Sequence, residues 1–413
     1  MKALPLPRLP ALGLIATLLA RSATTFSADA PAPLTLPKID RHPEASEYRP
    51  GRLAKVPRYD PGAGDPFQMD LRCADLSGLD LRESGKALSF ALFDTRTVWP
   101  PGDRMPAGFD RARILDLGRN PGLGVRRLHA RGITGKGVSL AIVDQPLILE
   151  HPEYGERIRL YEEVGMPTNV PCQMHGPAVA SIAVGKTCGV APGADLFFIA
   201  AFAFDAKAGR PKGGRDFTWY AQAVRRLVEI NRQLPGEKKI RALSLSVGWD
   251  KSEAGYDAME SAVQAAKAAG MLVTSSSIRT THGISINGLG RSPLADPDQF
   301  ESYGPGLFWG DGFPGGRQST NELLMPMDSR TVASFTSTND YTFYRQGGWS
   351  WITPYLAATY ALAVQVKPEL TPDEFLSLTF QTGRTIDCKF GDKVAPLGVI
   401  LDPVALIDAL ARK

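Results

Sequence analysis

From about residue 110 the chain alternates short apolar segments with longer segments of helical spacing. Alternation of this kind predicts an α/β fold with a doubly wound, mainly parallel sheet and helices on both faces. The segments between the apolar runs, 176–186, 217–234 and 252–270, have the length and spacing of helices. The apolar runs, which are typical of buried strands, are 137–144 (GVSLAIVD), 194–202 (ADLFFIAAF), 240–248 (IRALSLSVG), 270–278 (GMLVTSSSI) and 330–337 (RTVASFTS).

Residues 29–108 do not share this alternation. They are rich in proline and charge, and the segment LRCADLSGLDLRES (71–84) shows only a faint alternation of apolar and polar residues. A repeat architecture needs about three units to bury a core, so this segment does not predict one. The turn-rich sequence WPPGDRMPAG (99–108) marks a boundary. We therefore expect an N-terminal extension at 29–108 and one large domain at 109–413.

The first 28 residues have the layout of a secretory signal. Lys2 and Arg8 precede an apolar run from Leu9 to Ala20, and small residues follow it. A run of about 12 residues is too short to span a bilayer, and no later segment approaches the roughly 20 apolar residues that a spanning helix needs. The sequence predicts a signal peptide at 1–28, no stable membrane span, and a secreted or periplasmic protein.

The charge balance excludes two classes of partner. The formal net charge is +4, of which the leader contributes three basic residues, so the rest of the chain offers no strongly basic surface for nucleic acid or an anionic membrane.

The four cysteines, Cys73, Cys172, Cys188 and Cys388, could pair in an oxidising compartment. Cys172 and Cys188 bracket a short segment and are the preferred disulfide, and four buried free thiols are the alternative. The absence of a Cys-x-x-Cys pattern argues against a zinc site.

Three polar residues stand where a doubly wound sheet collects its functional side chains, at the carboxyl ends of strands and the N-termini of helices. Asp144 ends the run VSLAIVD, and His175 comes one residue before a helix of small and branched residues. Ser350 follows the letters GGW and begins a helix that is apolar all round, with Pro354 expected in the first turn. Each residue alone fits a structural role, as a turn aspartate, a surface histidine or an N-cap serine. Together they indicate a reactive site.

The chemistry that joins these residue types is acyl transfer. A serine hydroxyl is a weak nucleophile until an imidazole takes its proton, and the imidazole needs a carboxylate to fix its tautomer. The backbone N–H of Ser350, at the positive end of its helix, would face the developing oxyanion. A lipase-type hydrolase needs a G-x-S-x-G elbow and a histidine after the serine. The chain instead reads GWSWI and has no histidine after His282, which excludes that class.

The region from about 124 to 411 resembles a subtilisin-like (subtilase) serine peptidase, in which the residues follow the same order, Asp, His, Ser. The matching segments are TGKGVSLAIVDQPLILEHPEY for the aspartate, HGPAVASIAVGKTCGVAPGADLFFIA for the histidine and GGWSWITPYLAATYALAVQVKPELTPDEF for the serine. The resemblance implies a subtilisin-like fold with Asp144, His175 and Ser350 as the catalytic residues.

The resemblance also implies a substrate cleft for a protein or peptide. LSLSVG resembles the strand that lines the cleft, so Ser246, Val247 and Gly248 are expected to pair with the substrate backbone. Gly347 and Gly348 are expected to let the chain approach the substrate closely. The neighbouring tryptophans are expected either to form a wall of the cleft or to pack in the core.

The chain departs from the family at several positions. It reads DQP for Asp-Thr-Gly, HGPAVAS for His-Gly-Thr-His-Val-Ala-Gly and GWSW for Gly-Thr-Ser-Met. The asparagine that completes the oxyanion hole of the family should follow GMLVTSSSI, where the chain reads SSSIRTTHGISINGLGR. Ser277, Thr280 and Asn287 are the open alternatives for that donor. Loss of one such donor costs on the order of 100- to 1000-fold in turnover, which slows a reaction without abolishing it.

The sequence thus predicts an exported serine endopeptidase that works through an acyl-enzyme, with 29–108 as a pro-segment or a fixed extension. The alternative is a catalytically silent subtilisin-like fold that binds peptides or partner proteins. The three catalytic residue types argue against that alternative, and the missing oxyanion asparagine argues for it. A purely structural exported protein has only the extension in its favour. No cofactor and no metal site are expected, and calcium is implied by the family resemblance alone.

Overall fold

The computed structural model describes residues 34–60, 65, 67–204, 214–308, 321–390 and 392–412. The chain from Leu34 onward forms one compact unit. The expected signal peptide at 1–28 lies outside the described residues. Among the helices of the described ranges, none combines the length and apolar character needed to cross a membrane.

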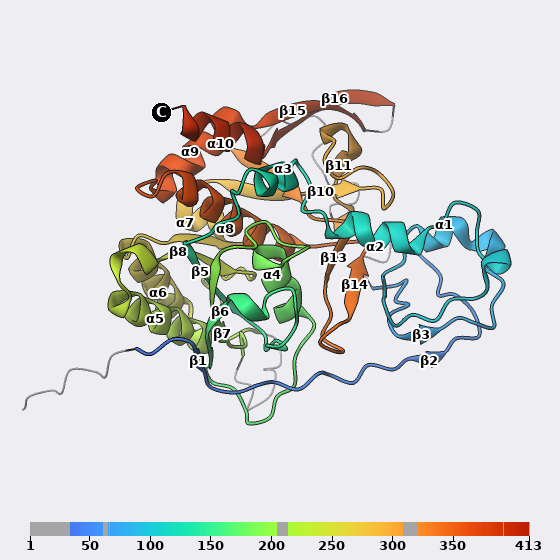
Figure 1. Ribbon diagram of the computed structural model, residues 1–413, viewed down its shortest axis with the longest axis horizontal. Coiled ribbons are helices and arrows are strands. Elements are labelled where there is room, and N and C mark those ends of the chain that lie inside the picture. The colour runs from blue at the N-terminus through green and yellow to red at the C-terminus, as the bar shows by residue number, and fades with distance from the viewer. Residues whose placement is uncertain are drawn as a thin grey trace, which may run out of the picture. The chain divides into compact units, whose positions relative to one another are not determined.

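A six-stranded parallel sheet forms the centre of the unit and confirms the predicted α/β fold (Figure 1). Its strand β5 (Ser139–Asp144) lies between two parallel neighbours, and all six of its residues are buried. A strand that is covered on both faces reads as a continuous apolar run, which explains the sequence SLAIVD. The order of the strands is β1 (Lys38–Ile39), β6 (Ile158–Glu163), β7 (Asp195–Ala200), β5, β8 (Ile240–Leu245) and β9 (Leu272–Ser275).

Helices cover both faces of the central sheet, as predicted. Leu140 and Ile142 of β5 pack with α4 (His175–Val184) and α8 (Trp349–Val366), while Ala141 and Val143 pack with α5 (Thr218–Gln233) and α6 (Tyr256–Ala268). Alternate residues of a strand face opposite sides, so one strand serves both cores. The other α-helices are α1 (Gly85–Leu88), α2 (Arg111–Arg119), α3 (Val125–Ala130), α7 (Ile278–His282), α9 (Pro372–Thr382) and α10 (Pro403–Ala411).

The remaining strands form smaller sheets that the sequence did not predict. The segment expected as a strand at 330–337 is β13 (Arg330–Ala333), but it pairs antiparallel with β14 (Tyr341–Tyr344) and not with the central sheet. The short connection between β13 and β14 makes a hairpin, which parallel strands cannot form. A five-stranded sheet has the order β11 (Tyr303–Pro305), β10 (Ser285–Arg291), β12 (Glu322–Pro326), β16 (Lys393–Ile400) and β15 (Arg384–Phe390).

The N-terminal extension belongs to the same compact unit from Leu34 onward. Its strand β1 adds to the edge of the central sheet, and its strand β4 (Phe93–Asp94) adds to β14. Between them the chain runs along one side of the body to β2 (Gly51–Arg52) and β3 (Ala74–Asp75), which pair with each other (Figure 1). Phe343 of β14 packs in the core cluster formed by the extension. The change of sequence pattern near residue 108 is therefore not a boundary in packing.

The predicted disulfide between Cys172 and Cys188 is wrong, because all four cysteines are free thiols. Cys172 precedes the N-terminus of α4 and Cys188 follows its C-terminus. A helix of ten residues is about 15 Å long, whereas the Cα atoms of a disulfide lie about 6 Å apart. Burial raises the pKa of both thiols. Cys73 and Cys388, in contrast to the expected burial, are partly exposed.

Candidate active site

Asp144 and His175 meet at the edge of the central sheet where β5 ends. Asp144 is the last residue of β5 and only 1% exposed, and His175 is the first residue of α4. Oδ1 of Asp144 lies 2.7 Å from Nδ1 of His175 and also accepts the backbone N–H of Gln145 at 2.8 Å. A carboxylate has no proton to donate, so the proton lies on Nδ1 and leaves Nε2 of the neutral ring as an acceptor.

The environment of His175 makes its imidazole a stronger base. Burial lowers the pKa of His175, but the negative charge of Asp144 and its hydrogen bond outweigh burial and raise the pKa above the ordinary 6.5. The side chain is 21% exposed, so the ring remains accessible. Its centroid lies 5.6 Å from the ring of Trp351, the residue after Ser350. The histidine thus packs against the start of the helix that carries the serine.

Ser350 is the second residue of α8 and is half-buried. Its Oγ donates a hydrogen bond to the carbonyl oxygen of Ser246 at 3.2 Å. The N-cap of α8 is Gly348, so the alternative in which Ser350 caps the helix is wrong. The side chain of Ser350 is therefore not needed to begin the helix.

Pro354 was expected in the first turn of the helix. It lies farther inside α8, beyond that turn. Proline has no N–H to donate to the carbonyl four residues earlier, which here is that of Ser350. The Ser350 carbonyl instead accepts the hydroxyl of Ser246 at 3.0 Å, and that hydroxyl also contacts Oγ1 of Thr353 at 2.7 Å. Ser246 thus binds both the hydroxyl and the carbonyl of Ser350.

A cavity of about 390 Å³ lies beside these residues. Ser246 and Val247, which follow β8, line the cavity. Gly248 is closely packed, because a Cβ there would lie 3.2 Å from the Cβ of Ser276. The pairing of these three residues with a substrate backbone stays a prediction. The other lining residues are Asp144, Gln145, His175, Ala201, Phe202, Ala203, Phe204, Gly214, Arg215 and Tyr220.

The three candidates for the oxyanion donor have different surroundings. Ser277 Oγ donates to the carbonyl of Trp249 and accepts its backbone N–H, at 3.0 and 2.9 Å. Thr280 is exposed on α7. Asn287 lies on β10, and its Oδ1 accepts the indole N–H of Trp349 at 3.1 Å. Asn287 is thus the candidate that contacts the residue before Ser350.

Asp328 is a buried carboxylate that the sequence analysis missed. Its Oδ1 accepts the backbone N–H of Gly347 at 2.8 Å, and its Oδ2 accepts that of Leu307 at 2.7 Å. Burial raises the pKa of Asp328 to about 6, although the two backbone hydrogen bonds lower it in part. A Cβ on Gly347 would lie 2.3 Å from the carbonyl oxygen of Met327, whereas Gly348 has open space around it. Gly347 is therefore required for packing in the chain, and the substrate approach expected of Gly347 and Gly348 stays a prediction.

Phe202 and Arg215, which also line the cavity, were missed as well. Phe202 follows β7 and stacks on Phe204, with ring centroids 4.9 Å apart. The rule that drew attention to Asp144, at the end of a parallel strand, applies equally to Phe202. Arg215 pairs with Glu253 at 2.5 Å, and no sequence pattern indicated its place in the wall.

The model of the Subtilase family matches residues 135–392, which is more than half of the chain and includes Asp144, His175 and Ser350. The chain belongs to the subtilase family. Membership supports a serine-type peptidase activity, a hydrolase reaction on a protein substrate. Within the described ranges of this subtilase, no group of three or more His, Cys, Asp or Glu side chains is arranged to hold a metal ion.

Individual relatives are similar over part of the molecule. The subtilisin-like protease PopC of Myxococcus xanthus (strain DK1622) is 36% identical over 85 residues, which cover 18% of this chain and 18% of that relative. Fervidolysin from Fervidobacterium pennivorans, a keratinolytic enzyme related to subtilisin, is 16% identical over 71% of this chain and 47% of its own, with a TM-score of 0.50. The prenylagaramide maturation protease PagA is 16% identical over 70% of this chain and 98% of its own, with a TM-score of 0.48. The likeness to fervidolysin supports the fold alone.

Proposed function

We propose that this subtilase is an exported serine endopeptidase in which Asp144, His175 and Ser350 form the catalytic triad. The observation that carries the proposal is the 2.7 Å hydrogen bond between Asp144 and His175 in the wall of a cavity. The Ser246 carbonyl, which accepts the Ser350 hydroxyl, belongs to the same wall. Asp144, His175 and Ser246 therefore border one accessible space, and Ser350 is joined to it through the Ser246 carbonyl.

In the proposed reaction, Oγ of Ser350 attacks the carbonyl carbon of a peptide bond while Nε2 of His175 takes the hydroxyl proton. Asp144 holds the ring by Nδ1 and stabilises the imidazolium. The positive end of α8 and the backbone N–H of Ser350 stabilise the oxyanion. His175 then donates its proton to the leaving amine, and water, activated by the same histidine, hydrolyses the acyl-enzyme. No cofactor takes part in these steps, so the reaction is expected to persist in a chelator.

In this proposal the Ser350 side chain rotates before it reacts. The hydroxyl donates to the Ser246 carbonyl and must turn to His175 Nε2 before attack. Catalytic hydrogen bonds often tighten only when substrate is bound. The observed contact therefore describes a resting state in this proposal.

A catalytically silent fold that binds peptides is the second candidate. The same Ser350–Ser246 contact favours it, and so does the engagement of Ser277 with the backbone of Trp249. In that case Ser350 would be a structural hydroxyl and the cavity a binding site.

Labelling with a fluorophosphonate probe separates the two candidates. The probe loses fluoride as the Ser350 Oγ–phosphorus bond forms, so it reports an activated serine. We expect label on Ser350 in the wild type and none in Ser350→Ala or His175→Ala. The matched controls are Ser377→Ala and His42→Ala, which change exposed residues outside the site. Absence of label on folded wild-type protein would support the silent fold.

Two further expectations follow from the same proposal. Because the pKa of His175 is raised, and the neutral ring is the base, labelling is expected to slow as the pH falls, with a midpoint above the ordinary 6.5.

Export is tested by expressing the chain with and without residues 1–28 in a Gram-negative host. We expect protein in the periplasm or medium only when the leader is present, and cytoplasmic retention of both forms would contradict export.

A further inference from the structure

The N-terminal extension contacts the segment that leads to His175. The backbone N–H of Cys172, three residues before His175, donates to the carbonyl of Glu44 at 2.8 Å. In return, the hydroxyl of Ser46 donates to the carbonyl of Cys172 at 2.5 Å. Two hydrogen bonds thus fix the approach to α4 from the extension.

The extension also contacts the segment that leads to Ser350. Nη1 of Arg72 donates to the hydroxyl of Tyr344 at 3.0 Å. Nε of Arg345 donates to the carbonyl of Ser89 at 2.9 Å. Strand β4 pairs with β14, whose last residue is Tyr344. The extension therefore holds β14 and Arg345, which precede the serine.

Arg72 is the central residue of this second contact. It is buried, and its Nε and Nη2 bind the two carboxylate oxygens of Asp70 at 2.9 and 2.7 Å. Cation–π contacts of this kind are strongest where water is excluded. The rings around the guanidinium, with centroids 5.0 to 5.8 Å from its carbon, are those of Tyr48, Phe67, Phe335 and Tyr344.

Packed aromatic rings continue from Arg72 to the catalytic histidine. The ring of Tyr344 meets that of Trp351 edge-on, with centroids 5.5 Å apart. Trp351 is buried and lies 5.6 Å from the ring of His175. Closely packed interiors transmit displacements, so a shift of Tyr344 would move Trp351 and the ring of His175.

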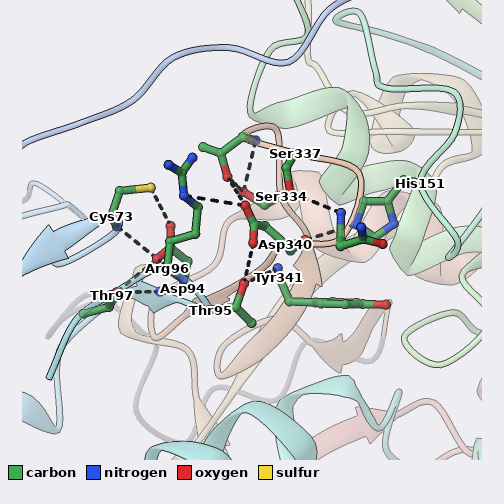
Figure 2. Close-up of polar contacts among 12 residues, drawn as sticks. Cys73, Asp94, Thr95, Arg96, Thr97, His151, Ser334, Ser337, Asp340 and Tyr341 are labelled. Atoms are coloured by element: carbon green, nitrogen blue, oxygen red, sulfur yellow. Dashed lines mark hydrogen bonds and ion pairs between the residues drawn. The ribbon is translucent and has the colours of Figure 1, made fainter.

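A third contact fixes the beginning of β14 (Figure 2). The hydroxyl of Thr95 donates to Oδ1 of Asp340 at 3.0 Å and accepts the backbone N–H of Tyr341 at 3.1 Å. The carbonyl of Asp340 in turn binds Nε2 of His151 at 3.0 Å. On the side of the extension, Asp94 binds the backbone N–H of Cys73 at 2.9 Å. The hairpin that carries β14 is thus joined to the extension at both ends.

We propose that residues 34–108 are a permanent part of the mature enzyme and hold the segments before His175 and Ser350 in place, with Arg72 as a positioning residue. The proposal rests on the proposed function, because it concerns the reactivity of Ser350. It decides between the two roles expected for the extension, since removal of a pro-segment would strip partners from Cys172, Tyr344 and Arg345 and expose the core around Phe343.

The test compares the fluorophosphonate labelling rate of the double variant Asp70→Asn/Arg72→Met with that of Asp80→Asn/Arg82→Met. The first removes both charges together, so no buried charge is left unpaired. The second changes an exposed pair in the same extension and serves as the control. A misplacement of about 1 Å can cost on the order of 100-fold in rate. We expect the first variant to label 10- to 100-fold more slowly and the control to stay within about twofold of the wild type.

The extent of labelling separates positioning from folding. A purely structural role would lower the fraction of protein that can be labelled, whereas a positioning role lowers the rate constant of the fraction that remains. Equal rate constants in both variants would overturn the role of Arg72. If the first variant does not fold, Tyr344→Phe keeps the ring and removes only the hydroxyl, with an expected decrease of roughly 3- to 10-fold.

Two measurements keep this proposal distinct from the proposed function. Hydrogen–deuterium exchange of residues 344–351 is expected to quicken in Asp70→Asn/Arg72→Met and not in the control, whether or not the wild type reacts with the probe. Unchanged exchange would overturn the clamp even in an unreactive protein. The mass of the labelled wild type under denaturing conditions is expected to include residues 34–108, and a fully reactive protein that begins after residue 108 would contradict the proposal.

Discussion

The tripeptide Asp-Leu-Arg occurs twice in the N-terminal extension, at 70–72 and 80–82, with the same local structure in different surroundings. In each copy the carboxylate accepts the backbone N–H of the arginine, at 3.1 and 3.2 Å, and its guanidinium Nε, at 2.9 and 3.0 Å. The leucine between them is buried in both. The local sequence is therefore sufficient to form the ion-paired turn.

The surroundings of the two turns differ sharply. The side chain of Arg72 is 9% exposed and that of Asp70 18%, whereas Arg82 and Asp80 are 63% and 50% exposed. Arg72 also donates to the hydroxyl of Tyr344, which is 272 positions away in the chain. One tripeptide is thus a surface turn in one place and a buried link to the serine segment in the other. The comparison shows that the distant partner, here Tyr344, and not the Asp-Leu-Arg turn itself determines the structural role of the arginine.

The largest expected difference concerns removal of one charge. Asp70→Asn leaves the buried guanidinium of Arg72 without a counter-charge, which we expect to lower the free energy of unfolding by about 3 kcal/mol. Asp80→Asn changes an exposed pair and is expected to have no measurable effect. Urea unfolding followed by tryptophan fluorescence measures both. Equal losses at the two positions would show that burial does not distinguish the turns.

A smaller difference is expected when the charge is kept. Arg72→Lys retains the positive charge but cannot bind both carboxylate oxygens and the Tyr344 hydroxyl in one plane, so we expect a loss of about 1–2 kcal/mol. Arg82→Lys is expected to be neutral. The same unfolding experiment measures both variants. An Arg72→Lys variant that is as stable as the wild type would show that only the positive charge of Arg72 contributes to stability.

The two pairs are also expected to differ in acid. Burial raises the pKa of Asp70, but the hydrogen bond and charge of Arg72, with the Tyr48 hydroxyl, outweigh it and lower the pKa below the ordinary 3.8. A carboxyl whose folded pKa is lowered stabilises the fold above its unfolded pKa and loses this effect as the pH falls through the folded pKa. The stability advantage of the wild type over Asp70→Asn/Arg72→Met should therefore shrink below about pH 4. The hydrogen bonds of Arg82 also lower the pKa of Asp80, to about 2, but this pair is exposed and screened by water. The advantage over Asp80→Asn/Arg82→Met is therefore expected to change less with pH, and unfolding between pH 2 and 7 tests both.

The smallest expected difference is in the response to salt. At 1 M salt the screening length is about 3 Å, which weakens exposed pairs and leaves buried pairs nearly unchanged. Double-mutant cycles at low and high salt should show the coupling between Asp80 and Arg82 falling to within error, while that between Asp70 and Arg72 persists. A parallel decrease of both couplings would indicate that water reaches Arg72.

The sequence predicted the central sheet and the Asp144–His175 edge because both depend on local patterns. Asp144 ends a run of buried residues and His175 starts a helix, and parallel packing brings strand ends and helix starts to the same edge. Ser246 and Val247 were predicted to line the cleft, and they line the cavity beside that edge.

The features that could not be predicted depend on contacts between distant parts of the chain. Arg72 binds Tyr344, 272 positions away, and Asp328 binds the backbone of Gly347 and Leu307 on other segments, and no periodicity marks these partners. The choice of β14 as the partner of β13 depended on the short connection between the two strands, which a periodic pattern does not contain. The predicted disulfide between Cys172 and Cys188 was wrong because the two residues are close in sequence but are separated in space by α4.

The proline in α8 has a consequence for protein engineering. Because Pro354 cannot donate to the Ser350 carbonyl, the wall residue Ser246 takes both polar groups of Ser350. A library that varies position 246 to change substrate preference would alter the reactivity of the enzyme in the same step. Phe202 and Arg215 also line the cavity and contact Phe204 and Glu253, so we expect changes at these two positions to alter specificity with less effect on Ser350.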